Sequence, residues 1–241
     1  GNLDVSYHST LASLQGLEGL TELGGSLFIE QNSGMIDLTG LEGIHSIPGS
    51  LYIRYNPDMQ ELVGLDNLGT IESYLSLIGN DSLVDLYGLG AVTTVGGHFY
   101  IDSNDDLLSL NGVDNLREIE GSMIIFNHLD LENLNGLEAL EWVGGDVQIT
   151  NNDRVVDMSG LTNLTTIEGR LKATGDRLFN LVGLENLVYI GGDLEVASAP
   201  QFVDFTGLNN LIEVGEDVRI NNLDALESLE GLQNLQNIEG H

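Results

Sequence analysis

One short motif, Gly-Leu-x-x-Leu, recurs along this chain of 241 residues at an almost constant interval. Ten copies begin at Gly16, Gly40, Gly64, Gly88, Gly112, Gly136, Gly160, Gly183, Gly207 and Gly231, with Val or Ile replacing a leucine in three of them. Successive copies are 24 residues apart, except for one interval of 23 residues between Gly160 and Gly183. A unit of this length cannot bury its apolar side chains alone, so such units stack on one another as a solenoid.

Each unit contains one short segment in which apolar and polar residues alternate. In the unit 16–39 this segment begins at Leu27 and ends at Glu30. Successive side chains of a strand point to opposite faces, so Leu27 and Ile29 are predicted to face inward and their neighbours outward. No unit carries an apolar stripe long enough for a helix. The pattern predicts an all-β chain of short strands and turns.

Two further residue types recur at fixed places in the unit. An asparagine follows the strand at Asn32, Asn56, Asn80, Asn104 and Asn152. Its amide is predicted to bond backbone groups of its own coil and of the next one. Other residues take this place at His128, Asp176, Ala199 and Leu223, so the later coils are expected to turn differently, with Asn127 and Asn222 compensating one place earlier. Glycine pairs before the strand predict a tight corner at Gly24-Gly25, Gly96-Gly97, Gly144-Gly145 and Gly191-Gly192.

The combined pattern, Leu-x-x-Ile-x-Gly-x-Leu-x-Ile-x-x-Asn-x-x-Leu-x-x-Leu, resembles the receptor L-domain, the leucine-rich repeat-like domain of insulin- and epidermal-growth-factor-type receptors. Similar repeats occur in microbial cell-surface proteins. Three residues separate Leu23 from Leu27, where ordinary leucine-rich repeats have two. The resemblance implies a right-handed parallel β-helix with an extracellular ligand-binding role. We therefore expect a right-handed parallel β-helix, or solenoid, of about ten 24-residue coils, roughly 45–50 Å long.

The repeat never breaks, so residues 1–241 are predicted to form a single domain. Both ends of the sequence fall inside a coil, and we expect it to be a fragment of a larger protein with flanking domains. Leu232, Leu235 and Ile238 are then expected to be poorly covered, with weak end-to-end self-association favoured by salt. No run of 18 apolar residues predicts a membrane span. The absence of cysteine argues against a disulfide-stapled ectodomain and agrees with a bacterial cell-surface or secreted protein.

Acidic residues dominate the charge of the chain, with 38 Asp and Glu against seven Lys and Arg and a net charge of −31. No basic face exists to meet phosphates, which excludes nucleic acid as a partner. Carboxylates also recur in two columns of the solenoid, one from Glu18 to Glu138 and the other from Asp37 to Asp157. Either salt screens them or calcium bridges them. We expect no cofactor and no metal site, and calcium stays open as the alternative.

The outward face of the main strand is the most informative surface. Aromatic and aliphatic residues gather there over five coils, and from Gln148 onward the same columns become polar. A contiguous exposed aromatic patch marks an interaction site, unless these side chains only cover the sheet or meet a flanking domain. The candidate ligand-binding residues are Phe28, Tyr52, Tyr74, Ile78, His98, Tyr100, Ile124 and Phe126.

The sequence lacks the motifs of common enzyme classes. It has no Gly-x-Ser-x-Gly elbow, no phosphate-binding loop and no cysteine, and its five histidines are scattered. We expect no enzyme. The sequence predicts an extracellular binding or adhesion module that recognises a polypeptide or a carbohydrate. The alternative is a structural spacer, which displays other domains and has no ligand of its own.

Overall fold

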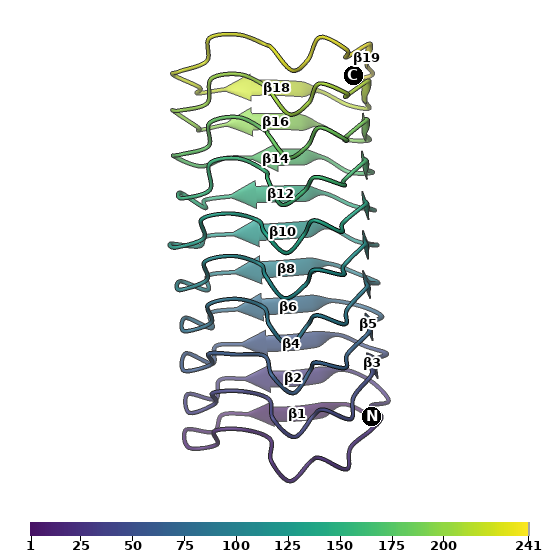
Figure 1. The fold of residues 1–241 in the computed structure, drawn as a ribbon, viewed down its shortest axis with the longest axis vertical. Coiled ribbons are helices and arrows are strands. Elements are labelled where there is room, and N and C mark those ends of the chain that lie inside the picture. The colour runs from purple at the N-terminus through teal and green to yellow at the C-terminus, as the bar shows by residue number, and fades with distance from the viewer. Residues whose placement is uncertain (241) are drawn as a thin grey trace.

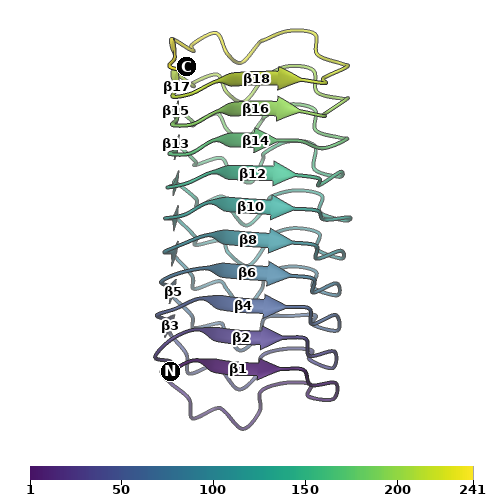
Figure 2. The ribbon, with the colours of Figure 1, turned by 180° about the vertical axis from the view of Figure 1, so that it is seen from behind.

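The computed structural model describes residues 1–240 and shows a straight β-solenoid with its two termini at opposite ends (Figure 1). Two parallel sheets run along it, of ten and nine strands within these residues. In Figure 2 the longer strands run left to right in front, and the chain climbs as it returns behind them, so the winding is right-handed. No helix is present in this part of the chain. The predicted all-β, right-handed solenoid of about ten 24-residue coils is confirmed.

The ten-stranded sheet contains one strand per coil, almost all of four residues. In sheet order its members are β1 (Leu3–Ser6), β2 (Leu27–Glu30), β4 (Leu51–Arg54), β6 (Leu75–Ile78), β8 (Phe99–Asp102), β10 (Met123–Phe126), β12 (Val147–Thr150), β14 (Leu171–Ala173), β16 (Leu194–Ala197) and β18 (Val218–Asn221). Each residue pairs with its equivalent in the next coil, as Leu27 does with Leu51. Equivalent positions of the sequence therefore form straight columns.

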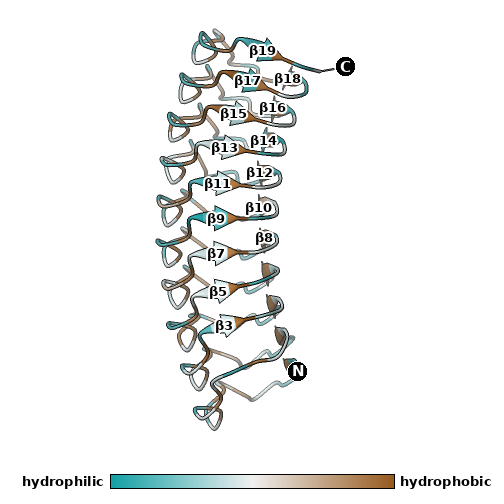
Figure 3. Ribbon diagram, turned by 90° about the vertical axis from the view of Figure 1, so that its right-hand side faces the viewer, coloured by the Kyte–Doolittle hydropathy of each residue, from teal (hydrophilic) through white to brown (hydrophobic). Residues whose placement is uncertain are grey.

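The nine-stranded sheet lies on another side of the solenoid, and its two-residue strands stack one above another in Figure 3. They are β3 (Ser46–Ile47), β5 (Thr70–Ile71), β7 (Thr94–Val95), β9 (Glu118–Ile119), β11 (Trp142–Val143), β13 (Thr166–Ile167), β15 (Tyr189–Ile190), β17 (Glu213–Val214) and β19 (Asn237–Ile238). The second residue of each strand faces inward and is buried in all but β19. Both sheets thus contribute to one continuous apolar core.

The motif glycines allow the coils to stack. Gly64 has a φ of +108°, a conformation that favours glycine, and a Cβ there would overlap the Leu38 carbonyl oxygen of the preceding coil. The glycine pairs before the strand act differently. The predicted bend at Gly96-Gly97 is present, but neither residue has a positive φ. A Cβ on Gly96 would overlap the Glu72 carbonyl oxygen, so close approach between coils, rather than backbone freedom, requires glycine there.

The predicted asparagine ladder is present and fully buried. The Asn56 side-chain oxygen accepts the Asn32 backbone N–H at 3.0 Å, and its Nδ2 donates to the Ile29 carbonyl at 2.9 Å. Each ladder residue thus pairs backbone groups of a turn that no water reaches. The buried ladder comprises Asn32, Asn56, Asn80, Asn104, His128 and Asn152.

The prediction that the ladder fails at His128 is wrong. The His128 Nδ1 accepts the Asn104 backbone N–H at 3.2 Å, and its Nε2 lies 3.3 Å from the Ile101 carbonyl, so the ring reproduces both bonds of an asparagine amide. Burial is the main cause of the lowered pKa of His128, which keeps the ring neutral. The predicted compensation by Asn127 is also wrong, since Asn127 is exposed and adopts the left-handed turn conformation that follows most of the long strands, with a φ of 62°.

The ladder does end after Asn152. Gly175 occupies the buried place in the coil that is one residue shorter, and Asp176 is exposed. Ala199 is buried in the next coil, without an amide to donate or accept. Asn222 has a φ of 54° and is exposed, like Asn127, and therefore does not replace the missing ladder residue at Leu223. The later coils consequently make this one turn without a buried ladder amide.

The three side chains predicted to be poorly covered, those of the last coil, are indeed not fully buried. Leu232 and Leu235 are partly buried against the core, and Ile238 is 54% exposed. Over residues 1–240, no helix has the length and apolar character that crossing a membrane requires.

Candidate functional site

The outward face of the long strands has the residue columns that the sequence predicts. Phe28 pairs with Tyr52, Tyr52 with Ser76, and Ser76 with Tyr100 in one column. We call the outward side of β2 to β10 the aromatic half of the sheet, and that of β12 to β18 the polar half.

Small Ser76 lies in this column between two tyrosines and creates a depression in the sheet surface. Ser76 is 2% exposed and forms the floor, with Tyr52 and Tyr100 on either side along the solenoid. The depression has a volume of about 390 Å³. We call it the Ser76 hollow, and it is lined by Tyr52, Arg54, Tyr74, Ser76, Ile78, His98, Tyr100 and Ile124.

Six of the eight predicted site residues therefore converge on one hollow, and the other two lie beside it. Phe28 stacks on Tyr52 with ring centroids 5.0 Å apart and thus supports the wall. Phe126 borders a neighbouring hollow of about 520 Å³, where the surface becomes polar from Gln148 onward. The aromatic patch is accordingly one connected surface with a single small floor residue.

Arg54 is the most important lining residue that sequence reasoning did not place in the site. Its guanidinium lies 4.2 Å from the Tyr52 ring centroid, a cation–π contact. Nε and Nη2 donate to the Ser76 hydroxyl at 3.1 and 3.0 Å, and Glu30 lies 3.9 Å from Nη1. A signal existed in the sequence, because Arg54 follows Tyr52 by two residues on the same face and Ser76 interrupts an aromatic column.

The hydrogen bonds of the rim fix its donors and acceptors. The Ser122 backbone N–H donates to His98 Nδ1 at 2.8 Å, so a neutral His98 carries its proton on Nε2. The His98 ring stacks on Tyr74 with centroids 5.0 Å apart and planes inclined by only 6°. The Tyr100 hydroxyl donates to Asp102 Oδ2 at 3.0 Å, and burial, followed by this bond, raises the pKa of Tyr100. The phenol therefore stays protonated and keeps its oxygen available as an acceptor.

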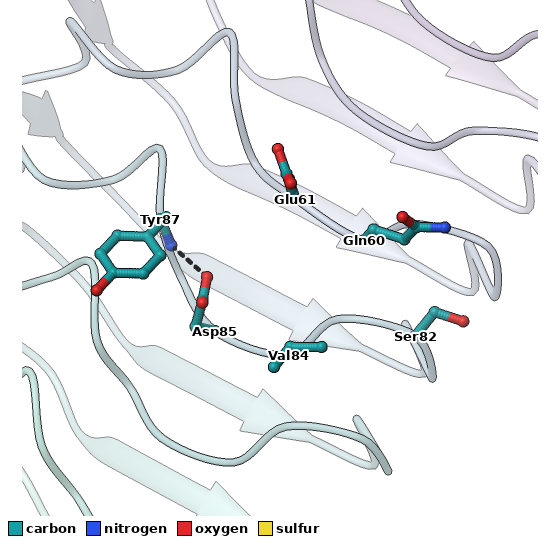
Figure 4. Close-up of a pocket in the computed structure, with 6 residues that line it drawn as sticks. All are labelled: Gln60, Glu61, Ser82, Val84, Asp85 and Tyr87. Carbon is teal, nitrogen blue, oxygen red and sulfur yellow. Dashed lines mark hydrogen bonds between the residues drawn. The ribbon is translucent and has the colours of Figure 1, made fainter.

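A second hollow, of about 490 Å³, lies on a different side of the coils (Figure 4). It is lined by Gln60, Glu61, Ser82, Val84, Asp85 and Tyr87. The Asp85 side chain accepts the Tyr87 backbone N–H at 3.0 Å and is thus part of a turn. This hollow is the larger, but it has no stacked rings and no guanidinium, and it contains none of the predicted residues. We therefore regard the Ser76 hollow as the candidate site.

The two acidic columns have a structural role that repeats along the solenoid. In the first column, Glu42 and Asp66 accept the backbone N–H of the motif glycine two residues earlier, at 2.9–3.1 Å. In the second, Asp37 and Asp157 accept the N–H two residues later. These turns explain the recurrence of most of the carboxylates without a bound cation.

The run from Asp102 to Asp106 resembles the start of a calcium loop, but its central residue, Asn104, already bonds within the ladder. Asn104 Oδ1 accepts the Asn80 backbone N–H at 2.9 Å inside the buried ladder. Within residues 1–240, no group of three or more His, Cys, Asp or Glu side chains is arranged to hold a metal ion.

The polar half of the sheet contains paired charges instead of rings. Lys172 contacts Glu195 at 2.9 Å, Arg170 contacts Asp146 at 3.0 Å, and Arg219 contacts Asp193 and Asp217. Such partly exposed pairs contribute little to stability and leave a solvated surface.

Comparison with known proteins adds no family assignment. No family model, no curated protein and no solved structure matches this chain.

Proposed function

We propose that this chain is a binding module, which recognises its ligand through the aromatic half of the long sheet. The observation that carries the proposal is the Ser76 hollow, where six predicted residues and Arg54 surround one small floor residue. Exposed rings beside fixed hydrogen-bonding groups are typical of recognition surfaces. We propose binding rather than catalysis, because the hollow offers no nucleophile held by a base.

The receptor L-domain-like pattern supports the same proposal at a finer level. Its family resemblance favours an extracellular setting, and the absence of cysteine favours a bacterial cell surface. The partner is then an extracellular protein or a glycan, and flanking domains of a longer chain would present this face. Adhesion is the function that such an arrangement serves best.

A spacer is the second candidate, and the uninterrupted sheets favour it. The buried core runs from Leu14 to Val214 without a break, which makes the solenoid a stiff support. A spacer does not need an aromatic half that differs from the polar half. The two functions therefore make different predictions for the rings.

The test is a triple substitution, Tyr52→Ser, Tyr74→Ser and Tyr100→Ser, compared with Gln148→Ser, Lys172→Ser and Glu195→Ser in the polar half. Both sets change exposed or half-buried outward positions, so both proteins should fold. The tyrosine set should abolish binding to cells or to an isolated ligand, and the polar set should not. Equal binding by wild type and both variants would contradict the proposal and favour the spacer.

A further inference from the structure

We propose that the ligand of the Ser76 hollow is a neutral oligosaccharide, with one sugar ring held above Ser76. This inference rests on the proposed binding function and assigns its ligand class. It follows from the shape of the hollow, from the groups on its rim, from the local charge and from the pairing of the strands.

The hollow has the size of a small polar ligand. Tyr52 and Tyr100 are two strands apart in one column, so their backbones are about 9.6 Å apart, twice the usual strand spacing. The volume of about 390 Å³ lies near the lower end of small-molecule sites, which span roughly 300–1,000 Å³. This space suits one or two sugar rings.

The rim combines flat apolar surfaces with fixed planar polar groups. The Ser76 bonds and the Tyr52 ring hold the Arg54 guanidinium, whose remaining N–H groups can donate. His98 offers an Nε2 donor in its neutral form, and the Tyr100 oxygen offers an acceptor next to Asp102. Sugar hydroxyls both donate and accept, and the C–H face of a sugar ring packs on aromatic rings, so this mixture fits a sugar.

The local charge favours a neutral ligand. The three outward columns from residue 26 to residue 126 contain two acids, Glu30 and Asp102, and one base, Arg54, a net charge of −1 in a chain of −31. An anionic ligand would be repelled by the remaining acidic surface, and a cationic ligand would be drawn to it. Within the hollow itself, Arg54 already lies against Glu30 and Ser76, and Asp102 already accepts from Tyr100, so the site suits a neutral polar ligand best.

The strand pairing argues against a polypeptide. β4, β6, β8 and β10 are each bonded to a strand on both sides, so no peptide can add to them as a further strand. The floor of the hollow is a serine hydroxyl already bonded to Arg54, so an apolar side chain anchored there would meet polar groups at its tip. A glycan needs neither feature.

The experiment is a glycan array that includes neutral and acidic oligosaccharides, followed by calorimetry with the best neutral one. Ser76→Tyr fills the hollow, and Tyr100→Leu removes one wall without adding bulk. Lys172→Tyr is the matched control, because it places the same side chain in the same column four coils away. Circular dichroism checks that each variant keeps the fold.

The wild type should bind neutral oligosaccharides, and both hollow variants should lose affinity by about tenfold or more, while Lys172→Tyr retains it. Equal affinity of Ser76→Tyr and wild type would overturn the assignment to this hollow. If the wild type binds only acidic glycans or a protein, and the tyrosine triple variant loses that binding, the inference is overturned and the proposed function stays intact.

Discussion

The buried ladder should contribute far more to stability than an exposed asparagine that bonds in a similar way. Asn80→Ala removes the acceptor of the Asn56 backbone N–H and the donor to the Ile53 carbonyl, bonds of 3.2 and 2.9 Å. Both groups are fully enclosed, and an unpaired buried group costs about 1–3 kcal/mol, so the expected loss is about 2–6 kcal/mol. For a chain of this size, that corresponds to a Tm lower by roughly 5–20 °C.

The matched control is Asn67→Ala, because Asn67 Nδ2 also donates to a carbonyl of the preceding coil, that of Glu42, at 2.9 Å. Asn67 is exposed, so water replaces the lost bond and the expected cost is only about 0.5–1 kcal/mol. Thermal unfolding followed by circular dichroism compares the two variants. Equal Tm shifts would refute the reasoning that burial gives the ladder its energetic weight.

Two further predictions concern pH and salt. Burial lowers the pKa of His128 in the folded chain below its ordinary value of 6.5, so the unfolded chain binds more protons near that pH. The stability that the neutral His128 ring contributes is therefore complete above pH 6.5 and is lost as the pH falls below it. His128→Asn keeps both ladder bonds without a titrating ring, so its Tm advantage over wild type should grow as the pH falls from about 7.5 to about 5.5. Parallel Tm curves would contradict this assignment. The net charge of −31 predicts a lower Tm at low ionic strength. If screening alone acts, NaCl and CaCl₂ at matched ionic strength should raise the Tm equally. A larger rise in CaCl₂ would support the alternative of calcium bridging, and an unchanged Tm in all three conditions would contradict both explanations.

The solenoid could be predicted because its information is local and repeated. The alternation at Leu27 and Ile29 defines the strand, and the constant period fixes the register, so the outward columns of the sheet follow directly. The same columns place Tyr52 and Tyr100 on either side of Ser76.

The errors arose where one residue type can perform the task of another. His128 replaces an asparagine amide because its two ring nitrogens contact the equivalent backbone groups. A sequence pattern that requires asparagine does not include this substitution. A second asparagine series recurs inside the motif itself, where the leucine pattern dominates the sequence. Its members, each bonded to a carbonyl of the coil before, are Asn67, Asn115, Asn163, Asn186, Asn210 and Asn234.

The lining of the candidate site could be predicted only in part, because long side chains bend across columns. Arg54 belongs to the column of Glu30 and Ile78, yet its guanidinium turns over Ser76 and Tyr52 in the neighbouring column. Backbone register alone does not give this direction. Hollows form where a small residue interrupts a column, and this rule would have identified Ser76.

The central claim is that the ligand binds to the aromatic half of the sheet, and the seven tyrosines allow a direct test. Protein labelled with fluorotyrosine gives a fluorine NMR signal for each, and substitution assigns them. Titration with the neutral oligosaccharide that binds most strongly should shift Tyr52, Tyr74 and Tyr100. It should leave Tyr87, beside the second hollow, and Tyr189, on the other sheet, unchanged. Shifts at Tyr87 or Tyr189 without any change at Tyr52, Tyr74 and Tyr100 would place the ligand elsewhere and contradict the account.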